Sequence, residues 1–194
     1  MMRTLFLIMA MLMAVPAARA DEPAEALAAL RAPLDRVMAV LQDPAPDAES
    51  RHRELVSLAE PLFDFPLMAK LALGRDHWLS LTPDQQRRYE RLFVDRLKSS
   101  YLQKLDLYTD QRVRYQEPVA AGPGKVHVPT VVADKDNEIG MRYKMYRSPQ
   151  GWRIYDVEIQ GVSIITTFRS QFDHILRDGS VEALMRELET PPGS

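Results

Sequence analysis

Hydrophobic residues in the first half of the chain recur every three or four positions, the period of a helix with one buried face. A first helix is predicted over residues 23–41, where Pro33 should kink or divide it. A second should begin after Asp47, a favourable N-cap. A third begins at Pro66, which suits a first helical turn, and ends at Gly74, which suits a C-cap. The apolar positions of the first two helices are Leu27, Leu30, Leu34, Val37, Met38, Leu41, Leu55, Leu58 and Leu62.

The clearest helix start lies at Thr82-Pro83-Asp84-Gln85. Thr82 can cap, Pro83 can occupy the first helical position, and Gln85 can reach back to complete a capping box. A long helix with one apolar stripe and a charged opposite face should follow. The stripe comprises Tyr89, Leu92, Phe93, Leu97, Tyr101, Leu105 and Tyr108.

After residue 110 the hydrophobic period changes to two, which is typical of strands with one buried face. Four antiparallel strands are predicted, over residues 112–117, 125–132, 138–147 and 152–159, while 43–47 and 118–125 have the Pro and Gly content of loops. In the third strand one face should carry Ile139, Met141, Tyr143 and Met145. Such residues suit either a filled core or the wall of a cavity.

A turn at Gly161 should lead into an apolar helix from about Val162, with Gly179 as its C-cap, and a last helix over residues 181–188. Pro191-Pro192 should end the ordered chain. The predicted fold class is therefore α+β, with N-terminal and C-terminal helices packed on a four-stranded antiparallel sheet.

The N-terminus has the pattern of a secretory signal peptide rather than of folded structure. Arg3 precedes an apolar run over residues 5–15, and Ala18-Arg19-Ala20 is an A-x-A cleavage site. We expect cleavage after Ala20; the alternative is a retained N-terminal anchor. The expected organisation is a signal peptide over 1–20, one domain over 21–190 and a disordered tail over 191–194.

Composition narrows the function further. Loss of 20 of the 194 residues, among them Arg3 and Arg19, would leave 174 residues and change the formal charge from −2 to −4. A mildly acidic chain without blocks of like charge does not favour nucleic-acid binding. The chain has no cysteine, so an exported domain would depend on its core rather than on disulfides.

Candidate catalytic residues are few. Ser163 follows Gly161, but Ile165 stands where a G-x-S-x-G nucleophile elbow needs its second glycine, so Ser163 is interpreted as a helix cap. Asp156 and Glu158 share a strand face and are the only pair considered for acid–base chemistry. Asp64 and Asp76 suit turns or caps. The histidines His52, His77, His127 and His174 have no metal-ligand spacing. No catalytic residue, metal or cofactor is predicted.

Several motifs, in order and at matching spacing, resemble those of the MlaC or toluene-tolerance family. The most specific is Trp152-Arg153-Ile154-Tyr155-Asp156-Val157 followed by Gly161-Val162-Ser163. Phe168 stands where the family often has tyrosine. The other matching segments are Phe63-Asp64-Phe65, Met68-Ala69, Ala72-Leu73-Gly74, Trp78, Thr82 with Gln85 and Gln86, Tyr101, Tyr108 and Phe168-Arg169-Ser170-Gln171-Phe172.

The resemblance implies helices on a strongly curved sheet that enclose an apolar cavity, in which phospholipid acyl chains lie while the head group stays in water. It implies a lipid carrier in the periplasm. Because the sequence has no second long apolar run, we expect a soluble protein without a transmembrane span, and we expect a monomer. Its partners would be an outer-membrane lipoprotein or porin complex and an inner-membrane ABC transporter complex. Buried methylenes contribute roughly 0.8 kcal/mol each, so such a site needs no catalytic group.

The expected cavity walls are the stripe of the long helix, the face of the third strand from Ile139 to Met145, and the helix over residues 162–172 together with Tyr155 and Val157 of the fourth strand. Tyr101, Tyr143 and Tyr155 are expected near the mouth, where an amphipathic ring suits a boundary with water. The predicted lipid-binding residues are Phe63, Leu67, Leu71, Trp78, Phe93, Leu97, Tyr101, Met141, Tyr143, Met145, Tyr155, Val157, Val162, Ile165 and Phe168.

Three alternatives remain open at this point. The chain could carry another apolar lipid, such as a hopanoid. It could be a small-molecule enzyme of the cone-shaped α+β type, which would need Asp156 as a base inside the cavity. It could also be an adaptor with a filled core and no ligand.

Overall fold

The computed structural model describes residues 21–43, 47–105, 111–133 and 137–190. The predicted signal peptide with its cleavage site, the tail after residue 190 and the stripe residue Tyr108 lie outside these ranges. The helices are α1 (Glu22–Gln42), α2 (Ala48–Ala59), α3 (Phe65–Leu73), α4 (Arg75–Ser80), α5 (Pro83–Leu105), α6 (Ile164–Asp178) and α7 (Val181–Glu189). The strands are β1 (Arg112–Tyr115), β2 (Val119–Gly122), β3 (Lys125–Ala133), β4 (Glu138–Ser148), β5 (Gly151–Ile159) and β6 (Val162–Ser163).

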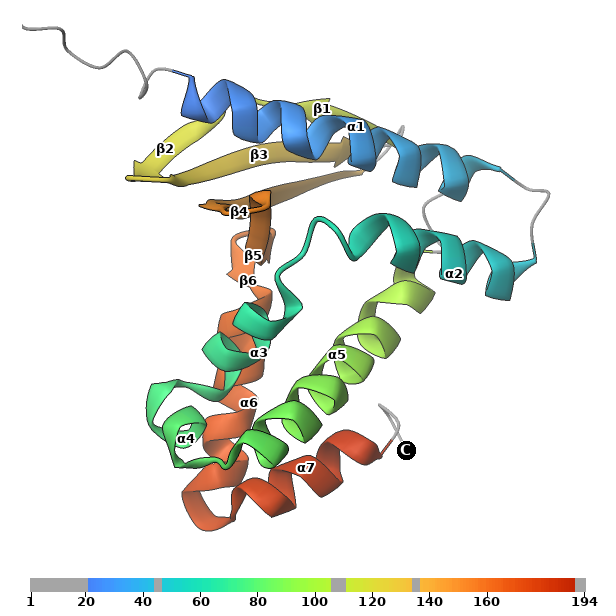
Figure 1. Ribbon diagram of the computed structural model, residues 1–194. Coiled ribbons are helices and arrows are strands. Elements are labelled where there is room, and N and C mark those ends of the chain that lie inside the picture. Colours follow the sequence, from blue (N-terminus) through green and yellow to red (C-terminus); the bar gives the residue numbers. More distant parts are fainter. Residues whose placement is uncertain (1–20, 44–46, 106–110, 134–136, 191–194) are drawn as a thin grey trace, which may run out of the picture.

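The strands form one antiparallel sheet in the order β1-β3-β4-β5-β6, with β2 also paired to β3 (Figure 1). The helix α1 lies along β1, β2 and β3, whereas α3 to α7 gather at the other end of the molecule around β5. The predicted α+β class is confirmed. The predicted count of four strands is wrong, because the described residues form six.

Both missed strands are short and lie beside tight turns. In β2, Val119 and Ala120 pair with His127 and Val126, although proline and glycine flank them. At the other end of the sheet, Gln160 and Gly161 have φ values of 51° and 79°, which makes a two-residue hairpin loop, and Val162 pairs with Ile159. The last two residues before α6 are therefore strand, and α6 begins at Ile164 rather than at Val162.

Pro129 lies inside β3, where its missing N–H would ordinarily break a ladder. The missing N–H of Pro129 lies on the edge of β3 that faces β1 and β2. Gln116 N–H donates to the Pro129 carbonyl at 3.0 Å, so the backbone polar atoms of Pro129 point to that side, between the end of β1 and the start of β2. The pairing of β3 with β4 continues unbroken across Pro129.

The predicted helix starts are confirmed by their hydrogen bonds. Thr82 and Gln85 form a reciprocal capping box, with Gln85 N–H donating to Thr82 Oγ1 at 3.3 Å and Thr82 N–H to Gln85 Oε1 at 2.9 Å. Asp64 accepts from Leu67 N–H at 3.0 Å, and Ser163 accepts from Thr166 N–H at 3.0 Å. These residues are caps, as interpreted from sequence.

Of the two expectations for Pro33, a kink or a division, division is wrong, and one short helix was not predicted. The helix α1 is not divided at Pro33, because packing on both sides of the proline holds one continuous helix despite the lost backbone hydrogen bond. The short helix α4 was missed. It follows Gly74 directly, whose φ of 84° reverses the chain after α3, and none of its residues is buried, so it has no apolar stripe.

The strand β5 contains one residue more than β4 opposite it. Lys144 pairs with Asp156 while the next residue, Met145, pairs with Ile154, so Tyr155 is the extra residue of a β-bulge. Trp152 and Ile154 lie on the inner face before the bulge, and Val157 lies on it afterwards. Alternation alone would have put Val157 on the opposite face from Ile154.

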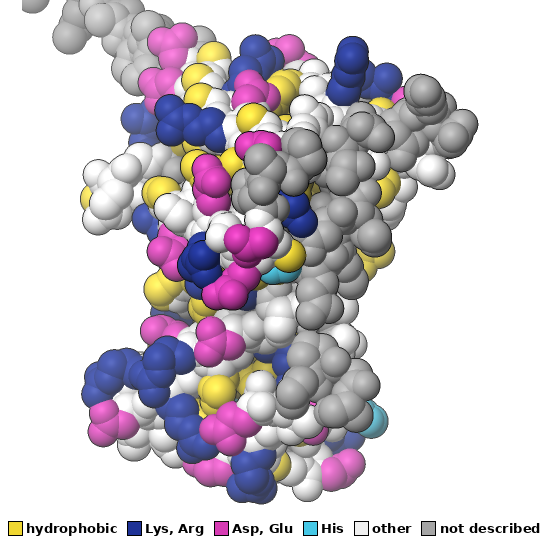
Figure 2. Space-filling model, turned by 90° about the vertical axis from the view of Figure 1, so that its right-hand side faces the viewer, with side chains coloured by type: hydrophobic (Ala, Val, Ile, Leu, Met, Phe, Trp, Pro, Cys, Tyr) yellow, Lys and Arg dark blue, Asp and Glu magenta, His cyan; other side chains and the backbone are white. Residues whose placement is uncertain are grey.

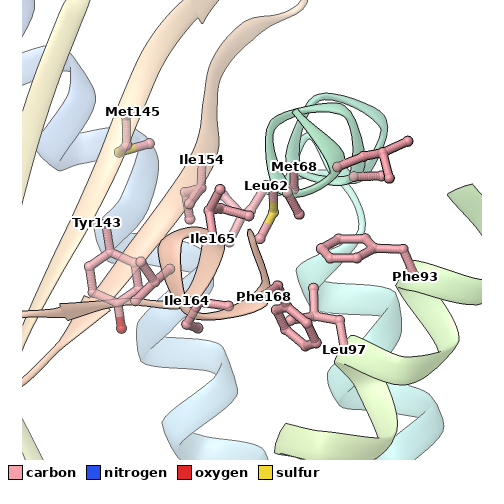
Figure 3. Close-up of a cluster of buried hydrophobic side chains, with 14 of the residues drawn as sticks. Leu62, Met68, Phe93, Leu97, Tyr143, Met145, Ile154, Ile164, Ile165 and Phe168 are labelled. Atoms are coloured by element: carbon pink, nitrogen blue, oxygen red, sulfur yellow. The ribbon is translucent and has the colours of Figure 1, made fainter. Parts of the chain in front are cut away.

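A dense core of aromatic and aliphatic side chains joins α3, α5, α6 and α7. Phe93 is fully buried, with its ring centroid 5.2 Å from that of Phe168 and 6.4 Å from that of Phe172. Tyr89 lies 6.2 Å from both Phe93 and Phe172 and donates its hydroxyl hydrogen to the Ala69 carbonyl. Figure 3 shows Phe93 and Phe168 beside Leu97.

Replacement of Phe93 by alanine should therefore lower the free energy of unfolding by about 3–5 kcal/mol, because it leaves a cavity among packed rings. Leu79→Ala is the matched control, since Leu79 is 65% exposed and its loss should cost less than about 0.5 kcal/mol. Urea denaturation of both variants checks the difference. Equal effects would contradict this description of the core.

Candidate functional site

Beside the dense core lies a cavity of about 520 Å³, lined almost entirely by apolar side chains. Its walls come from α1, α2, the first residues of α3 with the segment before it, the C-terminal half of α5, the inner face of the sheet and the first residue of α6. The lining residues are Leu30, Leu34, Val37, Met38, Leu41, Leu55, Val56, Ala59, Leu62, Phe63, Phe65, Met68, Leu97, Lys98, Tyr101, Leu102, Val113, Val132, Ile139, Met141, Tyr143, Ile154, Val157, Ile159 and Ile164.

The helix α1 forms one wall because its leucines, Val37 and Met38 recur at helical spacing on one side. Polar contacts hold it to the sheet outside the cavity. Tyr115 donates to Asp35 Oδ1 at 2.6 Å, and burial together with this bond raises the pKa of Tyr115 above its ordinary value. At the other end of α1, Glu25 forms an ion pair with Arg147, whose guanidinium lies over the Trp152 ring at 5.3 Å.

The sheet forms the opposite wall through inward-facing residues of β1, β3, β4 and β5, most of them on β4 and β5. Tyr143 pairs with Val157 and Met141 pairs with Ile159, and all four side chains line the cavity. The two β5 residues reach this face because the bulge at Tyr155 shifts the alternation. The bulge therefore extends the apolar wall to the end of β5.

The polar atoms in the lining are few. The Tyr143 hydroxyl donates to Met141 Sδ at 3.7 Å, and burial raises the pKa of Tyr143 to about 12. Burial also raises the pKa of Tyr101. Both tyrosines are therefore neutral near pH 7, so they add no charge to the cavity.

Six of the fifteen predicted wall residues line this cavity: Phe63, Leu97, Tyr101, Met141, Tyr143 and Val157. Tyr143 is only 6% exposed, so its ring lies within the wall and not at a boundary with water. Four others, Phe93, Met145, Ile165 and Phe168, are buried in the neighbouring core.

The remaining five lie away from the cavity. Leu67, Leu71 and Trp78 are half-buried on α3 and α4. Tyr155 is the bulged residue, and its ring packs edge-on against Tyr146 at 6.2 Å. Val162 is 60% exposed in the hairpin before α6.

Sequence reasoning missed the walls formed by α1 and α2. The signal was present, since Leu30, Leu34 and Leu41 were recognised as one apolar stripe and Leu55 as part of another. A stripe indicates that a helix face is covered. It does not distinguish a face against a packed core from a face against a cavity.

The carboxylates considered for catalysis lie on the outer face of the sheet. Asp156 is 5% exposed and accepts from Ser163 Oγ at 2.7 Å, Lys144 Nζ at 3.0 Å and Ile165 N–H at 3.2 Å. The enzyme alternative would require Asp156 to lie inside the cavity as a base. Neither Asp156 nor Glu158 lines it. The arrangement instead fixes the N-terminus of α6, where a carboxylate is favourable.

Among the residues that the structure describes, no group of three or more His, Cys, Asp or Glu side chains could hold a metal ion. No described helix is long and apolar enough to cross a membrane. One face of the molecule shows acidic and basic side chains interspersed with small hydrophobic areas (Figure 2).

Lys144 joins the two outer carboxylates, with its ammonium 2.6 Å from Glu158 and 3.0 Å from Asp156. The hydrogen bond from Lys144 lowers the pKa of Glu158 below its ordinary 4.5 despite partial burial. Burial opposes the charge on Lys144, but the two carboxylates outweigh it and raise the pKa of Lys144. The lowered pKa of Glu158 stabilises the fold above pH 4.5, and this contribution is lost as pH falls through the folded-state value.

Lys144→Gln should therefore lower the free energy of unfolding by about 1–3 kcal/mol at neutral pH, and the deficit should shrink below pH 4.5. Urea denaturation at both pH values checks this. Arg114→Gln is the control, because the Arg114–Glu138 pair is about 60% exposed on both sides and contributes about 0–1 kcal/mol. A deficit that is the same at both pH values would contradict the role given to Lys144.

Comparison with known proteins places this geometry in a family. One solved structure with the same fold is the phospholipid-binding protein from Ralstonia solanacearum, in complex with a phospholipid. It is 29% identical to this chain, with a TM-score of 0.76, and the match covers 85% of this chain and 95% of that one. The family model for the MlaC protein matches residues 31–190. The chain therefore belongs to the MlaC family.

Proposed function

We propose that this protein is a periplasmic carrier of phospholipids that holds acyl chains in the cavity between α1, α2, α5 and the sheet. The observation that supports this most directly is the lining, in which apolar side chains from five helices and four strands face one continuous space. Family membership and the phospholipid in the Ralstonia solanacearum protein support the class of ligand.

The energetics suit a ligand that is held by its chains. A buried methylene contributes roughly 0.8 kcal/mol, so about ten of them supply about 8 kcal/mol, which is the range of micromolar affinity. A cavity of about 520 Å³ falls within the range of ligand-binding pockets. Contact of this kind depends little on the length or unsaturation of the acyl chains.

Transfer of lipid requires partners that accept and deliver it. We propose an outer-membrane lipoprotein or porin complex and an inner-membrane ABC transporter complex, on the basis of family membership. Crosslinking of this protein to each purified complex, with and without bound lipid, tests that assignment. The mass of the lipid that co-purifies with the protein distinguishes a phospholipid carrier from a carrier of another apolar lipid, such as a hopanoid.

Val157→Trp should sharply reduce the lipid that co-purifies with the protein, because the added rings would occupy the space that acyl chains need. Val157 is 3% exposed and lines the cavity. Val162→Trp is a matched control five residues away, since Val162 is 60% exposed and outside the lining. Native mass spectrometry gives the lipid occupancy and mass, and circular dichroism verifies folding.

The two tryptophan variants also separate the alternatives. Loss of lipid from folded Val157→Trp alone supports the cavity as the site. Equal occupancy in both variants would contradict it, and absence of lipid from the wild-type protein would favour an adaptor.

We further propose that the first 20 residues direct the protein to the periplasm and are then removed. Expression of the full chain in a Gram-negative host should yield a protein in the osmotic-shock fraction with Asp21 as its N-terminal residue. Edman sequencing and intact mass check this. Ala20→Arg, which spoils the small residue at the cleavage site, is the control and should give the uncleaved mass. An uncleaved wild-type chain would support the retained anchor instead.

A further inference from the structure

Among the described residues that line the cavity, Lys98 alone carries a formal charge. It follows Leu97 on α5 and lies one turn before Tyr101, both of which also line the cavity. A charged ammonium is costly to bury, so its position marks a part of the wall that reaches water. The side chain of Lys98 retains 28% of its exposure, consistent with a place at the rim.

Two contacts hold the Lys98 ammonium at this rim. Nζ lies 3.2 Å from Glu60 Oε1, at the end of α2, and 5.8 Å from the centroid of the Phe65 ring. The rim thus joins the C-cap of α2 to the C-terminal half of α5. In Figure 1 the C-terminal end of α5 lies next to α2. The Glu60 side chain is 58% exposed, so the ion pair is solvated and easily opened by a competing charged group.

A phospholipid brings such a group to this place. When its acyl chains fill an apolar cavity, the phosphodiester must lie where the wall meets water, and a lysine ammonium is a good partner for phosphate. Glu60 adds a selective element, since its carboxylate attracts an ammonium on the head group and repels additional negative charge.

We propose that Lys98 and Glu60 form the head-group site of the carrier, with Lys98 on the phosphodiester and Glu60 on a protonated amine. The preferred ligand is then a zwitterionic phospholipid with a primary amine, such as phosphatidylethanolamine. This inference rests on the proposed function, because it assumes that the cavity holds acyl chains.

The test uses the full mature protein, stripped of lipid and incubated with vesicles that contain equal amounts of phosphatidylethanolamine, phosphatidylglycerol and diacylglycerol with identical chains. Native mass spectrometry then reports which lipid is bound. The wild-type protein should favour phosphatidylethanolamine.

Lys98→Gln should reduce the preference for phospholipid over diacylglycerol about fivefold, and Lys98→Arg should retain it. Glu60→Gln should raise the ratio of phosphatidylglycerol to phosphatidylethanolamine about threefold. Lys70→Gln is the matched control, because Lys70 is exposed on α3 and outside the lining, and should change neither ratio.

The outcomes are distinct. If the wild-type protein binds none of the three lipids, the proposed function fails. If it binds lipid and the ratios are unchanged in Lys98→Gln and Glu60→Gln, the cavity carries chains but the head-group site is refuted. Inorganic phosphate should not displace bound lipid; displacement would show a site for the free anion instead and would also overturn the proposal.

Discussion

At Tyr155 the strand β5 holds one residue more than β4 does opposite it, and both faces of the sheet depend on that insertion. Before the bulge, Ile154 faces inward, and after it Val157 and Ile159 do so, which carries the apolar wall to the end of the strand. On the outer face the same shift aligns Asp156 and Glu158 with Lys144 and Arg142. After the bulge, the strand therefore presents its carboxylates on the outer face and its apolar side chains on the inner face.

The outer layer then positions the helix that closes the core. Asp156 accepts hydrogen bonds from Ser163 and Ile165, across the hairpin formed by Gln160 and Gly161. With its N-terminus fixed in this way, α6 directs Ile164 toward the cavity and Phe168 into the aromatic core. Asp156, the base that the enzyme alternative would need, therefore fixes the helix that lies between the packed core and the cavity.

Much of this could be predicted from the sequence because local rules decide it. The capping box at Thr82, the cap at Ser163 and the strands β1, β3, β4 and β5 follow from short-range hydrogen bonding and alternation. The two short strands could not be predicted in the same way, since tertiary pairing with β3 and β5 produces them. The bulge has no periodic signal either, because it is a break in periodicity.

The division between core and cavity was the least predictable feature. Phe93 and Tyr101 lie on one stripe of α5, yet Phe93 contacts the rings of α6 while Tyr101 faces the cavity. Hydrophobicity indicates that a side chain leaves water, but the placement of the surrounding elements determines whether another side chain packs against it. The placement of α1 on the sheet depends on distant contacts, such as Tyr115 with Asp35, which the spacing along either segment does not encode.

A cavity of this size also lowers the stability of the fold when it is empty. Unfilled space in a protein core costs about 24 cal/mol per Å³, so a sealed and unoccupied volume of about 520 Å³ would cost on the order of 10 kcal/mol. That is comparable to the whole stability of a typical domain. The fold can tolerate such a space only if water reaches part of it or if a ligand supplies the missing contacts. The rim at Lys98 provides the first condition, and acyl chains would provide the second. The ion pair of Glu25 with Arg147 and the hydrogen bond from Tyr115 to Asp35 hold α1 against the sheet beside this space.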